Sequence, residues 1–168
     1  MSEEIKPIGT DTEGYHSLKR AMLALLSEYP GLGEQDVVFE NLPEKSSGLA
    51  VGADSGALII TRTENILGDI RQECQFPFFV IYRTSADSET QKLRVADFLD
   101  TFGMWLMGQP VTLSDVEYRL KTYPSLTGGR RITGVTVFNS YGIEPTQDGY
   151  QDWYLPATVN YTNEYEPW

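Results

Sequence analysis

Residues 70–84 read Ile70-Arg-Gln-Glu-Cys-Gln-Phe-Pro-Phe-Phe-Val-Ile-Tyr-Arg-Thr84 and hold the most apolar run of the 168-residue chain. Aromatic and β-branched side chains crowd the second half of this stretch, and such side chains suit the pleated surface of a strand. Apolar residues follow one another without alternation from Phe78 to Ile81. We therefore expect one long strand here, covered on both faces along that run.

A long amphipathic helix is predicted directly after this strand. Ser85, Asp87 and Ser88 end the strand, and Ser88 with Gln91 three residues later fits a capping box. The helix extends to Met107, and its apolar side chains recur at helical spacing at Val95, Phe98, Leu99, Phe102, Trp105 and Leu106. We expect this stripe to pack on the sheet that contains residues 70–84.

A second amphipathic helix is predicted near the start of the chain. Thr10 and Glu13 form a Thr-x-x-Glu capping box, and Pro30 ends the helical pattern. One face of this helix carries the apolar residues Tyr15, Leu18, Ala21, Met22, Leu25, Leu26 and Tyr29. The only histidine, His16, is expected at an exposed position on it, and a lone histidine cannot anchor a metal cluster.

Shorter patterns fill the rest of the chain. Residues 37–42 predict a strand, residues 49–51 and 57–60 a hairpin around a glycine-bearing loop, and residues 113–120 a short helix.

The last forty residues read as a second hairpin, made of residues 132–141 and 150–165. In its first strand, alternation puts Val135 and Val137 on one face and Ile132 and Phe138 on the other. Pro156 lacks an N–H, so it places the last strand at a sheet edge, at least locally. Together these elements predict an α+β fold, a mainly antiparallel sheet flanked by two amphipathic helices. The length suits a single domain, residues 1–168, with residues 160–168 as a candidate extended arm.

Charge and cysteine content narrow the function classes. The net charge is −11, and an acidic chain is not built to hold nucleic acid by neutralising phosphates, although DNA could pass close by. The single cysteine, Cys74, excludes an internal disulfide and is expected as a buried apolar side chain. No apolar run is long enough for a transmembrane helix, and no signal region is visible, so we expect a chain that stays inside the cell and off the membrane.

No catalytic constellation is visible in the sequence. One histidine and one cysteine could meet as a nucleophilic pair, but nothing around them supports this, and abundant carboxylates carry little information. We expect no enzyme activity, no cofactor and no metal. A small hydrolase or transferase remains the remote alternative, and it would need a pocket of titratable groups near Cys74 or His16.

Two groups of residues are candidates for protein contacts. Arg130 and Arg131 follow two glycines, and they form either a contact loop for an acidic partner surface or a solvated hairpin entrance. The end of the chain is rich in aromatic residues, namely Trp153, Tyr154, Tyr161, Tyr165 and Trp168. Such an end either folds back on the core or is held by a neighbouring subunit, and we favour the neighbour because Tyr and Trp are enriched where proteins meet.

Short motifs along nearly the whole chain carry a family resemblance. They include Asp11-Thr-Glu-Gly-Tyr15, Cys74-Gln-Phe-Pro-Phe78, Leu126-Thr-Gly-Gly-Arg130, Asn139-Ser-Tyr-Gly142 and Val159-Asn-Tyr-Thr-Asn-Glu164. On these motifs the chain resembles the minor structural proteins, often labelled minor capsid proteins, of tailed phages and prophages of Gram-positive bacteria, which are similar to tail terminators.

The resemblance implies a virion protein of the tail–neck region, assembled in the bacterial host cytoplasm. Six copies would form a ring that caps the tail tube, stops its polymerisation and offers a platform to a neck or head-completion protein. Thr61–Asp69 and Pro145–Tyr150 would face the tail tube protein, and Tyr154–Trp168 would join the subunits. DNA would slide through an acidic lumen without specific binding. The alternative is a head–tail connector or minor capsid protein that binds the portal side.

Overall fold

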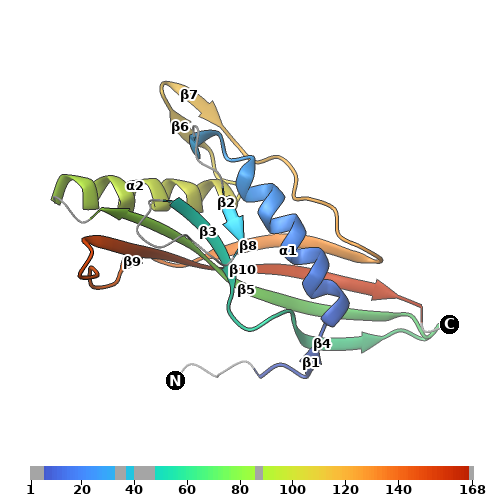
Figure 1. Ribbon diagram of the computed structural model, residues 1–168. Coiled ribbons are helices and arrows are strands. Elements are labelled where there is room, and N and C mark those ends of the chain that lie inside the picture. The colour runs from blue at the N-terminus through green and yellow to red at the C-terminus, as the bar shows by residue number, and fades with distance from the viewer. Residues whose placement is uncertain (1–5, 33–36, 40–47, 86–88, 167–168) are drawn as a thin grey trace, which may run out of the picture.

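A computed structural model describes residues 6–32, 37–39, 48–85 and 89–166 of the chain (Figure 1). These residues form an α+β fold in which two helices lie against a mainly antiparallel sheet. The fold class expected from the sequence is confirmed. The predicted capping box at Ser88 and the last residue, Trp168, lie outside the described residues.

Two long strands form the spine of the sheet. β5 (Ile70–Ser85) and β10 (Tyr150–Tyr165) pair antiparallel over all 16 residues of each strand. Figure 1 shows them running side by side through the molecule. Residues 160–165, considered above as part of an extended arm, are therefore paired strand.

Shorter strands flank this spine on both sides. β8 (Arg130–Val137) and β9 (Tyr141–Gly142) pair with β10, and β3 (Gly48–Ala53) and β4 (Leu58–Glu64) pair with β5. β1 (Gly9–Thr10) pairs with β4, and β2 (Val37–Phe39) pairs with β3 in the parallel sense. β10 is thus an interior strand of the described sheet.

The expected hairpin of residues 49–51 and 57–60 does not form. β3 pairs with residues 78–83 of β5, and β4 pairs with residues 70–75. Both strands run antiparallel to β5 and follow one another along the same side of it. The length of β5 makes this possible, because one strand of 16 residues has room for two short partners.

Burial along β5 alternates, which corrects the expectation of a run covered on both faces. Cys74, Phe78 and Val80 are buried, whereas Phe79 and Ile81 are half-buried on the opposite face. The reason is that both helices pack on the same face of the sheet, so only every second residue of the strand meets them.

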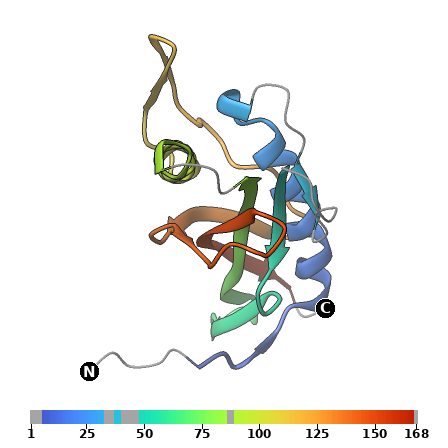
Figure 2. The same cartoon turned by 60° about the vertical axis from the view of Figure 1, so that its left-hand side comes forward.

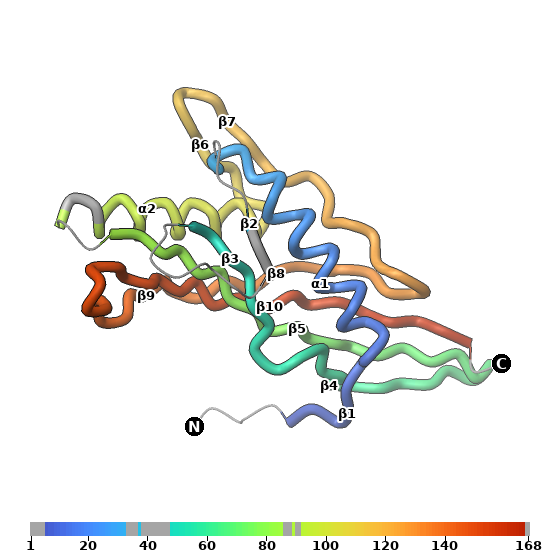
Figure 3. The backbone as a smooth tube through the Cα atoms, in the orientation of Figure 1, coloured from blue at the N-terminus to red at the C-terminus, as the bar shows by residue number. Residues whose placement is uncertain are grey.

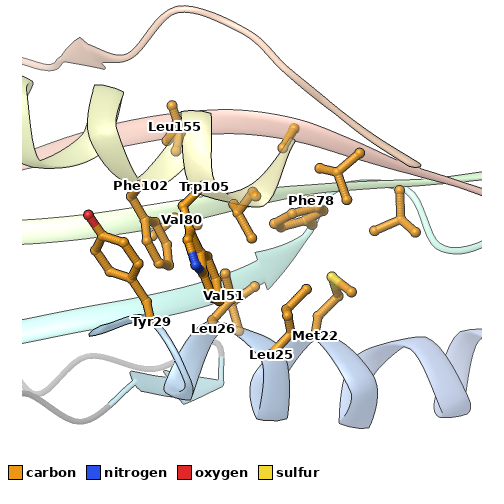
Figure 4. Packing of buried hydrophobic residues seen from close by; sticks show 14 of the residues in the cluster. Met22, Leu25, Leu26, Tyr29, Val51, Phe78, Val80, Phe102, Trp105 and Leu155 are labelled. Carbon is orange, nitrogen blue, oxygen red and sulfur yellow. The ribbon is translucent and has the colours of Figure 1, made fainter. Parts of the chain in front are cut away.

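The segment just after α1 (Thr12–Ser27) meets α2 (Glu89–Leu106) above the sheet through aromatic rings. The ring of Tyr29, which lies just before the 3-10 helix η1 (Pro30–Leu32), has its centroid 4.5 Å from that of Phe102 and 5.2 Å from that of Trp105. Figure 4 shows side chains of both helices and of the sheet filling the space between them. The apolar stripes predicted for the two helices are confirmed, with Tyr15 and Phe98 half-buried at their margins.

Residues 113–120 form no helix. β6 (Val111–Leu113) and β7 (Val116–Tyr118) make a separate hairpin, joined by Ser114 at φ 48° and Asp115 at φ 65°. Positive φ at both central positions is the conformation of a tight two-residue hairpin turn, and Asp tolerates it better than most residues. The hairpin projects beyond the helices (Figures 1 and 2).

A β-bulge in β8 overturns the predicted facing of its side chains. Gly134 pairs with Asn160 and Ile132 with Tyr161, so no residue of β10 stands opposite Thr133, whose hydroxyl donates to the carbonyl of Asn160 at 3.0 Å. The extra residue shifts the alternation of side chains by one position, so Ile132 and Val135 are both buried on the helix side of the sheet.

Pro156 sits in an interior strand without disturbing its pairing. The N–H of Phe138 donates to the carbonyl of Pro156 at 2.9 Å, so the backbone groups of Pro156 point away from β5. On the side of β10 toward which the Pro156 nitrogen points, β8 has already ended at Val137 and β9 begins only at Tyr141, so no strand there needs an N–H from this residue. The prediction of an edge is wrong for the strand as a whole and correct for this one position.

Candidate functional site

The side chain of Arg130 is held inside the subunit. It is 9% exposed, and its guanidinium makes a two-point ion pair with Asp11, at 2.8 Å from Nε to Oδ2 and 2.6 Å from Nη2 to Oδ1. Both roles expected for Arg130, a contact with an acidic partner and a solvated position at a hairpin, need an exposed side chain, and Arg130 does not have one. Its neighbour Arg131 is exposed.

Asp11 joins three parts of the fold. Its carboxylate accepts hydrogen bonds from the N–H of Gly14 at 3.0 Å and from the hydroxyl of Tyr161 at 2.8 Å. It therefore caps α1, in place of Thr10, which lies in β1. Because Arg130 belongs to β8 and Tyr161 to β10, Asp11 ties the start of the helix to two strands. Tyr161 is only 1% exposed, so it is not available to a neighbouring subunit.

The Asp11 carboxylate should make the fold sensitive to acid. Burial alone would raise its pKa, but hydrogen bonds from Arg130, Tyr161 and Gly14 outweigh burial and hold the pKa below the usual 3.8. The unfolded chain then binds the proton more readily than the folded chain. The stability that this carboxylate contributes is present above pH 3.8 and is lost as the pH falls through the lower, folded pKa.

Urea unfolding between neutral pH and about pH 3 checks this prediction. The midpoint of the wild-type chain should fall more steeply below pH 4 than that of Asp11→Asn, which has no proton to bind at this position. Glu13→Gln, on an exposed neighbouring carboxylate, should keep the wild-type steepness. Equal slopes for wild type and Asp11→Asn would show that the ion pair does not govern acid stability.

The single cysteine is buried in the helix-facing core. Cys74 is 3% exposed, and burial raises the pKa of its thiol to about 11. At neutral pH the thiol stays protonated, and a protonated thiol is a poor nucleophile. Its expected role as a buried side chain is confirmed.

The opposite face of the sheet, which we call the open face, carries an aromatic group. No described helix packs on it, and it bears the half-buried residues Phe79, Ile81 and Tyr154. The ring of Tyr154 lies 5.6 Å from that of Phe79 and 5.7 Å, stacked, from that of Tyr141. Tyr141 is 51% exposed, and Phe138, whose N–H donates to the carbonyl of Pro156 two residues along β10 from Tyr154, is 55% exposed. Contiguous apolar surface of this kind is typical of sites of protein contact.

Charges on the open face nearly cancel. Across β5 and β10, Arg83 pairs with Asp152 at 2.7 Å, and Arg71 pairs with Glu164 at 3.6 Å. With Glu73, these two strands present two positive and three negative side chains on this face, whereas the whole chain carries a net charge of −11. An acidic protein can therefore approach this face with little repulsion.

A rigid turn between β4 and β5 displays two aliphatic side chains in solvent. Ile66 is 102% exposed and Leu67 is 82% exposed, the highest values among the exposed large apolar side chains of the described chain. Asn65 closes this turn, because its side-chain oxygen accepts hydrogen bonds from the N–H groups of Leu67 and Asp69, each at 2.9 Å. The sequence signal was an aliphatic pair inside a polar turn, and the turn lies within residues 61–69, which the sequence had singled out as a candidate contact segment.

A basic groove lies at the β8 side of the sheet. It has a volume of about 900 Å³, and four of the thirteen basic residues of the chain line it, namely Arg71, Lys121, Arg130 and Arg131. Glu164 is the one acidic residue among the described residues of its lining. Spacing along the sequence gave no sign of this groove, because the segment that carries Lys121 is distant in sequence from β5.

The remaining candidate contact residues are spread over different surfaces. Trp153 is half-buried on the helix side and packs against the core, whereas Tyr154 lies on the open face. Tyr165 is 39% exposed at the end of β10. The structure therefore does not gather the described aromatic residues Trp153, Tyr154, Tyr161 and Tyr165 into one contact.

One pocket near Cys74 is lined by titratable side chains, namely Arg71, Glu73, Cys74 and Tyr161, of which Cys74 and Tyr161 are buried. His16 is exposed on α1. Within residues 6–32, 37–39, 48–85 and 89–166, no three His, Cys, Asp or Glu side chains are grouped to hold a metal ion. None of the helices in these ranges has the length and apolar character needed to cross a membrane.

Comparison with known proteins adds little. No protein-family model and no curated protein matches the chain. One solved structure, whose name states no function, aligns with 95% of this chain and 100% of its own, at 13% sequence identity and a TM-score of 0.38. A likeness at that TM-score supports no argument about function.

Proposed function

We propose that this chain is the subunit of a six-membered ring that ends the tail tube of a phage or phage-tail-like particle. The sequence motifs suggest this class of protein. The observation that carries the proposal is the open face, where Phe79, Tyr154, Phe138 and Tyr141 form an aromatic surface of little net charge. Such a surface serves assembly better than chemistry.

Termination requires a ring with two different faces. One face binds the last ring of the tube, and the other lacks the surface that a further tube ring needs, so polymerisation stops there. The second face is then free to bind a neck or head-completion protein. The acidic residues that remain outside the contacts would keep DNA from adhering as it passes through the lumen.

Loss of the ring subunit should change the length of the tails. Deleting its gene from a particle-producing strain should give tails several times longer than normal, because nothing stops the tube protein from adding. Electron microscopy of the particles measures the lengths directly, and expression of the wild-type chain from a plasmid should restore them.

Tails of normal length with heads left unjoined would contradict the terminator and would instead identify a connector on the portal side. Point variants give a finer version of the same experiment. Tyr154→Ser with Phe138→Ser, on the open face, should reproduce the deletion, whereas Val116→Ser, an exposed apolar residue of the β6–β7 hairpin, should not.

A further inference from the structure

We propose that the turn of residues 65–69 in one subunit seats in the basic groove of a second copy of this chain. The inference rests on the ring proposed above and deepens it by assigning the contact between neighbouring subunits. It also assigns this turn to the contact between subunits, whereas the sequence analysis above expected it to face the tail tube protein.

The turn is built to be held by a partner. Ile66 and Leu67 are almost fully in solvent, which is a costly place for two aliphatic side chains. The turn is also held rigid, because the Asn65 side chain accepts two backbone hydrogen bonds and donates a third to Asp69 at 3.1 Å. A rigid loop loses little conformational freedom on binding, so its apolar side chains can contribute most of their burial to affinity.

The groove complements the turn in both polarity and charge. Tyr123, Leu126 and Ile132 supply apolar surface to its lining. Lys121 and Arg131 line it as well, and neither forms an ion pair with a described residue. The aliphatic pair of the turn matches the apolar lining.

The acidic flanks of the turn match these two cations. Glu64 precedes the turn and Asp69 closes it, so negative charge stands on either side of Ile66 and Leu67. Opposite charges placed across an interface fix its register and speed association. Because the chain carries a net charge of −11, a second copy is an occupant that a basic groove attracts.

The topology makes this contact suitable for a ring. Ile70 pairs with Tyr165 and Arg130 with Asn163, so the turn and the start of β8 lie at the same end of the sheet (Figure 3). Arg130 and Arg131, at the start of β8, line the groove. Arg131 of the groove lies in β8, which the order β4-β5-β10-β8 separates from β4 by roughly 14 Å at the usual strand spacing, and the groove also reaches Arg71 of β5, two residues after the turn. A contact between two different surfaces of identical subunits is heterologous, and it closes into a ring when the rotation between neighbours allows.

Two double variants of the full chain test the contact. Ile66→Ser with Leu67→Ser removes the apolar tip, and Lys121→Glu with Arg131→Glu reverses the free charge of the groove. Each should raise the Kd of self-association by about tenfold or more, as measured by sedimentation equilibrium. Leu93→Ser and Arg94→Glu, on the exposed side of α2, are the matched controls and should leave the Kd unchanged. Equal unfolding midpoints will show that all variants fold.

Mixing the two double variants gives the sharper result. The tip variant keeps an intact groove and the groove variant keeps an intact tip, so together they should form 1:1 dimers that do not grow further. A mixture that stays monomeric, or single variants that still form the wild-type assembly, would overturn the contact and leave the proposed function standing. A wild-type chain that does not assemble would overturn the ring and the contact together. If the Ile66→Ser with Leu67→Ser variant still formed the ring but no longer bound the tail tube, the turn would contact the tube and not the neighbouring subunit.

Discussion

Replacing Asp11 with alanine should lower the free energy of unfolding by about 3–5 kcal/mol, because the change leaves the buried guanidinium of Arg130 without its partner. The same change removes the cap of α1 and the acceptor for the hydroxyl of Tyr161. Urea unfolding at neutral pH, followed by circular dichroism, measures the loss. A chain that does not fold at all with this change would agree with the upper end of the range.

Two further variants separate the roles of this carboxylate. Asp11→Ser keeps an oxygen that can cap the helix, so it should recover about 1 kcal/mol of the loss and no more. Glu13→Ala should change the stability by less than about 0.5 kcal/mol, because Glu13 is 90% exposed and lies 3.9 Å from Arg130. If Asp11→Ala proved as mild as Glu13→Ala, the buried ion pair would not hold the fold together.

Gly129→Ala should destabilise the chain by about 3 kcal/mol or more. A Cβ at this position would overlap the carbonyl oxygen of Glu164 in β10, and backbone atoms cannot move aside as a flexible side chain can. The close approach exists because the N–H of Glu164 donates to the carbonyl of Gly129 at 3.1 Å. The shift of the thermal midpoint measures the effect.

Gly134 provides the matched control five residues away. A Cβ at Gly134 would meet nothing within 4 Å, so Gly134→Ala should leave the chain as stable or stabilise it by about 0.5 kcal/mol, since glycine weakens a strand. Opposite signs at two nearby glycines would show that packing against Glu164 decides the result. Similar losses at both would point to backbone freedom instead.

The elements with the strongest local patterns were predictable from the sequence. β5 and β10 were recognised from their length and their aromatic and β-branched residues, and both helices from apolar residues at helical spacing. These patterns work because one apolar stripe or face must be buried wherever the element lies in the fold. Even so, local patterns do not say how many layers cover a strand, and the half-buried Phe79 and Ile81 were wrongly expected in the core.

Short segments were wrong where distant pairing or turn chemistry decides the structure. Leu113, Val116 and Leu120 have helical spacing, yet Ser114 and Asp115 adopt positive φ and turn the chain into a hairpin. β3 and β4 looked like a hairpin because they are neighbours in sequence, but each finds a longer partner in β5. A single bulge at Thr133 was enough to reverse the predicted facing of Ile132.

The candidate contact residues show the same limit. Arg130 and Tyr161 were expected at the surface. Residue types and spacing cannot reveal that both side chains donate hydrogen bonds to Asp11, more than a hundred residues earlier in the chain. The groove beside Arg131 became visible only once distant segments were placed together, whereas the turn at Ile66 is closed by hydrogen bonds within residues 65–69.

The proposed ring forms only if this chain binds copies of itself, and the mass of the assembly in solution tests that most directly. Native mass spectrometry of the wild-type protein at micromolar concentration should give about six times the 18.9 kDa of one chain. A single-chain mass at every concentration up to the solubility limit would contradict the account.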